Sequence, residues 1–205
     1  MNITSATLAP LAPAALQPAG DDGALPGDFA IWIFIFAEML AFGVLFVAYA
    51  FTRAQDVELF NAAQLTLDRT SGFINTLVLI TSSYFVVRAV SSIRRGLANS
   101  CAYWLSGAWL LGAVFIGIKA VEFHDKFNAG ITLSTNAFYM FYLALTFFHF
   151  MHVLMGMIIL GCVIVKARRG GYSRHDYVGV ETSASFWHMV DLLWIILFPL
   201  VYVIR

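Results

Sequence analysis

The chain has 205 residues, of which 60% are hydrophobic and only 12% are charged, and its formal net charge at pH 7 is zero. With a mean hydropathy of +0.80 it is too apolar for a water-soluble globule, so we expect a polytopic membrane protein. Because it has no long run of Lys and Arg and no phosphate-binding loop motif, nucleic acids and nucleotides are excluded as expected partners.

Residues 1–28 differ in composition from the rest of the chain. They contain four of the five prolines together with Asp21, Asp22 and Asp28, and they precede the first aromatic residue, Phe29. Such a segment cannot bury enough apolar surface to fold, so we expect a disordered N-terminal tail. It lacks the positive start and continuous apolar run of a cleavable signal peptide, which leaves insertion to the first membrane helix.

Five long apolar stretches follow the tail, and each reaches the roughly 20 residues that a helix needs to cross a bilayer. The sequence therefore predicts an all-α fold in which one membrane domain, residues 29–205, contains five transmembrane helices at about 29–51, 72–92, 103–123, 136–166 and 183–204. The fourth stretch is longer than the hydrocarbon requires, which indicates tilt or a projecting end. The links are too short to form a further domain.

The orientation is predicted from the basic residues of the links, because cytoplasmic loops carry an excess of Lys and Arg. With the N-terminus in the cytoplasm, the inner links hold Arg94, Arg95, Lys166, Arg168, Arg169 and Arg174. The outer side then holds Arg53, Arg69, Lys126 and Arg205. We therefore expect a multi-pass protein of the bacterial cytoplasmic membrane with a cytoplasmic N-terminus and a periplasmic C-terminus.

Glu38 is the only acidic or basic residue in the first apolar stretch. A charged group at membrane depth costs about 2.5 to 3.5 kcal/mol on insertion, so such residues usually mark a function or a close packing partner. With no basic residue in the same stretch, Glu38 is expected to be protonated or bonded to another helix. It is a candidate functional acid, and a neutral carboxyl that donates a hydrogen bond across a helix interface is the alternative.

His149 and His152 stand three residues apart on the fourth helix and therefore share one face, with Gly156 nearby to permit close approach. Two imidazoles could ligate zinc, copper or haem iron. A metal site needs three or four ligands, however, and further ligands would have to come from other helices. Interhelical hydrogen bonding explains the pair with fewer assumptions, so we predict no metal site.

The last helix carries Glu181, Ser185, His188 and Asp191 at spacings of four, three and three residues, which places them on one stripe. His188 and Asp191 can therefore meet, and we expect them to act as a pair. An imidazole beside a carboxylate suits a proton relay or an oriented metal ligand. The alternative is a neutralised pair that locks this helix to a neighbour.

Glu122 has basic neighbours one turn away on both sides, Lys119 and Lys126. An ion pair near the membrane boundary is the simpler explanation for it. Asn75 and Ser82 lie two turns apart on the second helix and are expected to hydrogen bond to other helices.

The order of these motifs resembles subunit III of haem-copper oxidases in its short form with five helices. The resemblance covers nearly everything after residue 27 and rests on Trp32 with Ala37-Glu38, Asn75-Thr76, the run KAVEF at 119–123, Thr146 with His149 and His152-Val153, and Glu181 followed by WHMVDLLW at 187–194. The last motif is the most specific of these.

Within that family the chain most resembles the NorE type, which is associated with the nitric oxide reductases of denitrifying bacteria. The run PGDFAIW at 26–32 and the run GITLSTNAFYM at 130–140 carry this finer resemblance. Phe147 and Phe150 depart from the wider oxidase pattern, which often has glycine beside the first histidine.

The resemblance implies a V-shaped helix bundle with phospholipid in its cleft and no haem or copper of its own, since the partner subunit carries haem and metal. It implies a role in assembly, stability and sustained proton uptake. It matches Glu38 to the family's carbodiimide-reactive carboxylate. The remaining candidates correspond to a buried polar network or to lipid and partner contacts: Asn75, Glu122, His149, His152, Glu181, His188 and Asp191.

These observations lead to three functional hypotheses. The first is an accessory subunit or assembly factor of a respiratory haem-copper-type enzyme, namely nitric oxide reductase, without catalysis of its own. The second is subunit III of an aerobic cytochrome c or quinol oxidase. The third is a small proton or metal transporter, against which stand the absence of an inverted repeat and of helices broken by paired Gly and Pro.

Overall fold

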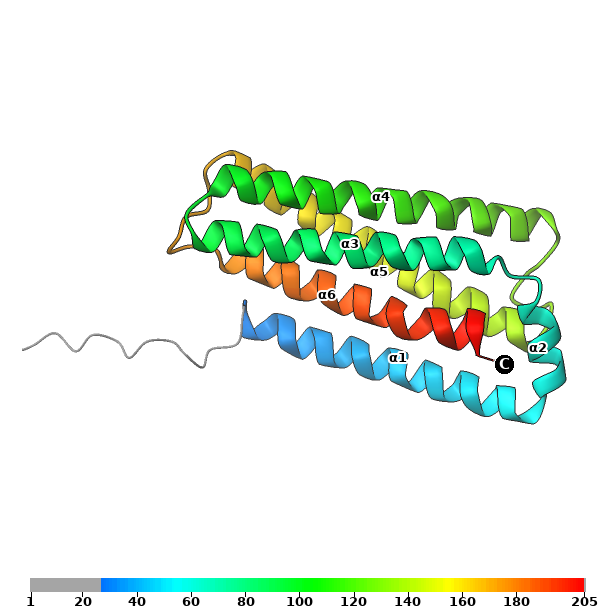
Figure 1. Cartoon of the computed structure of the whole chain (residues 1–205). Coiled ribbons are helices and arrows are strands. Elements are labelled where there is room, and N and C mark those ends of the chain that lie inside the picture. Colours follow the sequence, from blue (N-terminus) through cyan, green and yellow to red (C-terminus); the bar gives the residue numbers. More distant parts are fainter. Residues whose placement is uncertain (1–26, 205) are drawn as a thin grey trace, which may run out of the picture.

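The computed structural model describes residues 27–204 and is all-α, with five helices long and apolar enough to cross a membrane (Figure 1). The predicted fold class is therefore confirmed. The elements are α1 (Phe29–Gln55), α2 (Val57–Gln64), α3 (Arg69–Arg94), α4 (Ala98–Asn128), α5 (Ala137–Arg168), α6 (Val178–Phe198) and the short π-helix η1 (Pro199–Val203).

The membrane helices are longer than the sequence predicts, because the prediction counted apolar residues only. α4, for example, spans Ala98–Asn128 instead of 103–123. Polar residues extend these helices beyond their apolar segments, and a capping side chain marks the start of α1, α3 and α5. Asp68 accepts a hydrogen bond from the Thr70 N–H at 2.9 Å at the start of α3. A hydrogen bond from the Ser71 hydroxyl lowers the pKa of Asp68.

The helix α2 is absent from the sequence prediction, which treated residues 53–71 as a link. Asp56 caps it by accepting from the Leu59 N–H at 3.1 Å. The helix buries Phe60 and Gln64 completely, and the Gln64 amide donates to the Val201 carbonyl at 2.9 Å. This short helix therefore closes one end of the bundle against the C-terminal segment (Figure 1).

The boundary of the predicted tail is two residues too late. Positions 1–26 of that tail lie outside the described residues. Gly27 and Asp28 belong to the folded domain, since Asp28 caps α1 by accepting from the Ala30 N–H at 3.2 Å. The Asp28 N–H donates to the Thr182 hydroxyl at 3.1 Å, which joins the start of α1 to α6.

Helix α1 is the outlying helix of the bundle. It packs against α5 and α6, whereas α3, α4, α5 and α6 lie side by side (Figure 1). Its outer face exposes large apolar side chains, among them Phe36, Leu40 and Val47. In a membrane, such a face contacts lipid or another apolar helix. The five-helix bundle is as predicted, and the V shape implied by the resemblance stays a prediction.

Two glycines make room for Trp187, one of the two fully buried tryptophans of the core. A Cβ built on Gly112 would lie 2.8 Å from the Trp187 ring, and one on Gly156 would lie 2.9 Å from it. Because Gly112 is on α4 and Gly156 is on α5, the indole of α6 fits between two helices that pack closely. The close approach predicted at Gly156 is therefore with a side chain of a neighbouring helix.

The last predicted helix, 183–204, begins earlier than expected and is interrupted near its end. Pro199 has no N–H to donate, and its ring cannot fit against the carbonyl of the preceding turn. α6 consequently ends at Phe198, and the chain continues as the π-helix η1, which buries Val201 and Tyr202. The π turn points Tyr202 into the bundle, where it reaches α4.

The links predicted to be cytoplasmic gather at one end of the bundle (Figure 1). There the end of α3 meets the start of α6 through Arg94 and Glu181. The opposite end holds α2 and the start of α5. The topology places the two sets of links at opposite ends, while the side of the membrane that each occupies stays a prediction.

Candidate functional site

Three arrangements in the described part of the chain contain ion pairs. One, which we call the lysine cluster, consists of Lys119, Glu122, Tyr142 and Tyr202. The second is a pair between Glu38 and His152. The third is a pocket between α3 and α6, which we call the α3–α6 groove; its polar lining residues are Ser91, Arg94, Arg95, Glu181, Ser185 and His188.

The lysine cluster joins α4, α5 and η1. The Lys119 ammonium lies 3.0 Å from one Glu122 carboxylate oxygen and donates to the Tyr202 hydroxyl at 2.7 Å. The other carboxylate oxygen accepts from the Tyr142 and Tyr202 hydroxyls, each at 2.6 Å. The ion pair predicted between Lys119 and Glu122 is confirmed, whereas Lys126 donates elsewhere, to the Thr66 carbonyl.

This cluster is closed, because every strong polar group in it has a partner. The Lys119 side chain is fully buried, and aromatic rings surround its ammonium, with the centroids of Trp194 and Phe123 at 5.2 and 5.3 Å. A buried charge pair is tolerable only when hydrogen bonds satisfy its remaining donors and acceptors. The two tyrosines supply those bonds, so the arrangement acts as a cross-brace between helices.

Glu38 does not stand alone in the folded chain. His152 Nε2 lies 3.1 Å from a Glu38 carboxylate oxygen, which links α1 to α5. The other ring nitrogen of His152 lies 2.8 Å from the Phe148 carbonyl. Since a carbonyl only accepts, that nitrogen carries a proton and fixes the ring orientation. The expectation that Glu38 is bonded to another helix is borne out, since its partner His152 belongs to α5.

His149 does not follow the interhelical hydrogen bonding predicted for the histidine pair. It is fully buried, and neither ring nitrogen has a hydrogen-bond partner among residues 27–204. Its ring instead packs against Phe115 and Trp194, with centroid distances of 5.7 and 5.2 Å. Helical spacing placed the two histidines on neighbouring parts of one face, but α1 supplies an acid only to His152.

Asn75 is likewise buried without a partner for its amide in the described part of the chain, contrary to its predicted bonding role. Ser82, two turns further along α3, does fulfil that role. Its hydroxyl donates to the Ala108 carbonyl at 3.0 Å and accepts from the Trp187 indole at 3.0 Å. These contacts hold α3, α4 and α6 together.

The predicted meeting of His188 and Asp191 is wrong. His188 Nδ1 lies 2.7 Å from the Ser83 hydroxyl of α3. Asp191 is almost fully buried, and neither of its carboxylate oxygens has a hydrogen-bond partner within residues 27–204, although Ser83 is close enough to interact with it electrostatically. Spacing on one helix gives a shared face, but the neighbouring helix decides which groups bond.

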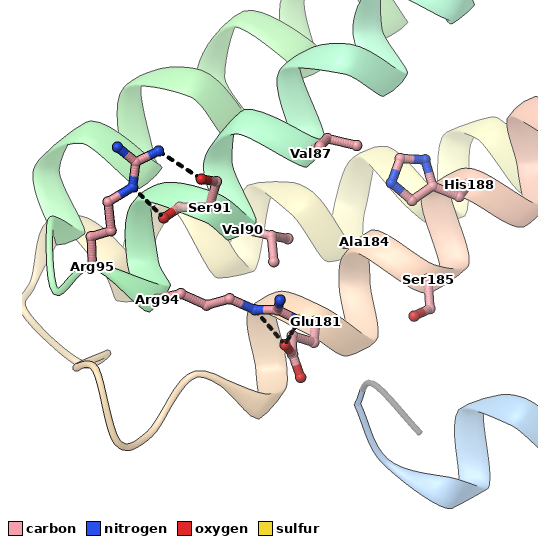
Figure 2. Close-up of a pocket in the computed structure, with 9 residues that line it drawn as sticks. All are labelled: Val87, Val90, Ser91, Arg94, Arg95, Glu181, Ala184, Ser185 and His188. Atoms are coloured by element: carbon pink, nitrogen blue, oxygen red, sulfur yellow. Dashed lines mark hydrogen bonds and ion pairs between the residues drawn. The ribbon is translucent and has the colours of Figure 1, made fainter. Parts of the chain in front are cut away.

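Glu181 lies at the end of α6 that faces the links, and Arg94 reaches it from α3 (Figure 2). The guanidinium donates to one carboxylate oxygen from Nη2 at 2.7 Å and from Nε at 3.2 Å. The other oxygen accepts from the Gly27 N–H at 3.3 Å. Glu181 therefore ties α1, α3 and α6 together and lines the α3–α6 groove, a pocket of about 420 Å³.

The described residues contain no group of three His, Cys, Asp or Glu side chains that could hold a metal ion. The sequence candidates are distributed over separate places: Glu38 with His152, Glu122 with Lys119, and Glu181 with Arg94. None of these pairs brings a nucleophile and a base together beside a substrate pocket. Two of the pairs join different helices, and Glu122 with Lys119, both on α4, reaches α5 and η1 through Tyr142 and Tyr202.

Several residues of these arrangements were missed by the sequence analysis. Ser83, Tyr142 and Tyr202 are ordinary members of apolar helices, and only the tertiary fold brings them to their partners. Arg94 and Arg95 were counted as link charges. Two adjacent arginines at the end of a membrane helix were the available signal for a polar site, because such residues border the membrane interface.

Fold and sites together define a membrane protein whose buried ionisable groups brace a five-helix bundle. The sequence model of the family described as "Cytochrome c oxidase subunit III" matches residues 26–204. The chain therefore belongs to the cytochrome c oxidase subunit III family, as the resemblance in its motifs indicates.

Three relatives illustrate this membership. Cytochrome c oxidase subunit 3 of Thermostichus vulcanus is 34% identical over 184 residues, which cover 84% of each chain. Quinol oxidase subunit 3 of Bacillus subtilis is 29% identical over 83% of each chain. The heme-copper oxidase subunit I+III of Aeropyrum pernix is 28% identical over 85% of this chain but only 22% of its own length.

Proposed function

We propose that this chain is the accessory third subunit of a respiratory haem-copper oxidase that uses cytochrome c or quinol, in the cytoplasmic membrane. The observation that carries the proposal is the family match over residues 26–204, together with relatives named as oxidase subunits 3. In the Aeropyrum protein, subunits I and III are named as one polypeptide. A chain of this kind then works beside a subunit I, which supplies the haem and the metal.

The arrangement of the charged groups favours an accessory, structural role over catalysis by this chain alone. In the lysine cluster and in the Glu181–Arg94 pair, each charged group is paired with another charged group of this chain. The apolar outer face of α1, with Phe36 and Leu40 exposed, suits contact with lipid or with a catalytic subunit. The Glu38–His152 pair beside that face is the place where the subunit could carry or buffer a proton for its partner.

Nitric oxide reductase is the second candidate partner. The runs at 26–32 and 130–140 favour it through their resemblance to the NorE type. The relatives reported above carry the names of cytochrome c and quinol oxidases, so the oxygen-reducing enzyme ranks first.

Respiration in membranes lacking the chain separates the two candidates. We expect membranes from a deletion strain to lose sustained oxygen consumption, with recovery on expression of the intact chain, while nitric oxide consumption stays unchanged. Loss of nitric oxide consumption alone would show that the partner is nitric oxide reductase. Unchanged rates for both gases would contradict the proposal and favour a transport role.

A further inference from the structure

Three tyrosine rings in and beside the lysine cluster form a continuous row. Tyr139 and Tyr142 lie one turn apart on α5 with their ring centroids 6.4 Å apart, and the Tyr142 ring lies 6.1 Å from that of Tyr202. All three side chains are buried. A phenol can lose an electron to a strong oxidant, and neighbouring rings at these distances can exchange electrons. The row therefore has the parts of a route for single electrons.

The hydroxyl of Tyr142 has a base beside it. An oxidised phenol is a strong acid, so a tyrosine loses an electron readily only when a nearby group takes its proton. The Tyr142 hydroxyl donates to the Glu122 carboxylate at 2.6 Å. Because an ionised carboxylate only accepts, the proton already points at the group that would receive it.

Tyr202 is a poorer electron donor than Tyr142, although both bond to the same carboxylate oxygen. The Tyr202 hydroxyl lies 2.6 Å from that oxygen but also accepts from the Lys119 ammonium at 2.7 Å. A positive charge on the phenol oxygen opposes the loss of an electron. The Lys119 nitrogen is further from the Tyr142 ring, 5.7 Å from its centroid.

Tyr139 lies between Tyr142 and the surface. The Thr66 hydroxyl donates to the Ala63 carbonyl at 2.7 Å, so it accepts from the Tyr139 hydroxyl at 2.7 Å. A neutral hydroxyl is a weak base, and a radical is therefore not held at Tyr139. Thr66 is exposed at the end of the bundle that holds α2, which makes Tyr139 a link from that surface to Tyr142.

We propose that Tyr142 is a redox-active tyrosine that gives up one electron while Glu122 accepts its proton. The O–H bond of Tyr142 breaks, a new O–H bond forms on the Glu122 carboxylate, and a neutral tyrosyl radical stays on Tyr142. The electron passes through Tyr139 to a one-electron oxidant, which is thereby reduced. The site belongs to this chain alone. Only the natural oxidant, an oxidised haem of the catalytic subunit, rests on the proposed function.

Photo-oxidation of the purified full chain tests the site without a partner. Light and persulfate convert tris(bipyridine)ruthenium(II) into its ruthenium(III) form, a soluble one-electron oxidant, and the samples are frozen for electron paramagnetic resonance. We expect a long-lived tyrosyl signal that narrows with ring-deuterated tyrosine and is lost in Tyr142→Phe. Tyr139→Phe should slow the appearance of the signal, and an unchanged rate would remove Tyr139 from the route.

Tyr49→Phe is the matched control. Tyr49 is also fully buried, but its hydroxyl lies beside the neutral Gln64 amide, at 3.4 Å, so this variant should keep the signal. An unchanged signal in Tyr142→Phe, or an equal loss in Tyr49→Phe, would overturn the assignment. Circular dichroism verifies that each variant is folded.

Infrared difference spectroscopy of the intact chain follows the proton. We expect the band of a protonated carboxyl group to appear together with the radical and to be missing in Tyr142→Phe. A radical without that band would overturn the transfer to Glu122. Because no partner is present, these results do not depend on which enzyme the chain serves.

Discussion

The lysine cluster and the α3–α6 groove use the same kinds of groups in opposite ways. In the lysine cluster, the Lys119 ammonium pairs with the Glu122 carboxylate, which also accepts from two tyrosine hydroxyls, and no charge remains for a ligand. In the groove, one arginine is paired and the next is not, and the polar groups border an open pocket. Charged groups that are buried with all their hydrogen bonds formed hold helices rigidly together. An unpaired charge beside an open pocket stays available to another group.

The largest effect is expected when one charge of the lysine cluster is removed. Glu122→Gln leaves the Lys119 ammonium buried without a counter-charge, which should cost about 3 to 5 kcal/mol of stability. Combining it with Lys119→Met removes the stranded charge, so the double variant should be more stable than Glu122→Gln alone. Reversible unfolding in mixed detergent measures both variants, and simple additivity of the two single effects would contradict the buried-pair explanation.

Tyrosine replacements compare how much the individual hydrogen bonds of the same cluster contribute to stability. Tyr202→Phe keeps the ring but loses the bond to Glu122 and the bond from Lys119, while Tyr142→Phe loses only one bond to Glu122. Each bond to a charged group contributes about 1.5 to 3 kcal/mol. We expect both variants to be less stable than the intact chain, with Tyr202→Phe the less stable of the two. Equal stabilities would show that Tyr202 adds nothing beyond Tyr142.

The packing between the two regions is tested by a pair of glycines on α4. Gly112→Ala would place a methyl group 2.8 Å from Trp187 and should cost about 1 to 3 kcal/mol, since the indole must shift. Gly117→Ala meets nothing within 4 Å and should be neutral or slightly stabilising, because alanine favours the helix. Thermal unfolding compares them, and equal destabilisation of both would refute the tight packing at Trp187.

The smallest effect is expected at the groove. Glu181→Gln removes the ion pair with Arg94, whose side chain is 56% exposed, so the cost in stability should stay below about 1 kcal/mol. A loss of stability as large as that of Glu122→Gln would mean that the groove braces the bundle as the lysine cluster does.

The sequence predicted the membrane helices because an uninterrupted apolar length is a direct signal of a span. It missed α2, since an eight-residue helix with three buried residues has no comparable signature. It predicted the Lys119–Glu122 pair because both residues lie on one helix turn. It paired His188 with Asp191 because spacing on one helix does not show that Ser83 of α3 lies against His188. It missed Tyr202 because that side chain reaches Lys119 only through the π turn that follows Pro199.

The resemblance to subunit III was confirmed by the family match, whereas the finer NorE assignment stays a prediction. The difference has a physical reason. The family motif includes Glu181 and His188, which bond to α3 inside this bundle, whereas the outer faces expose mainly large apolar side chains. Those faces are apolar, and many sequences satisfy such a requirement.

Copurification tests the central claim most directly. The tagged chain is isolated from its native membranes in mild detergent, its companions are identified by mass spectrometry, and the haem spectrum of the preparation is recorded. The proposal predicts a haem-containing catalytic subunit of a cytochrome c or quinol oxidase in stable association. A preparation that contains the chain with no haem protein would contradict an accessory role, and one that contains nitric oxide reductase subunits would contradict the oxidase assignment.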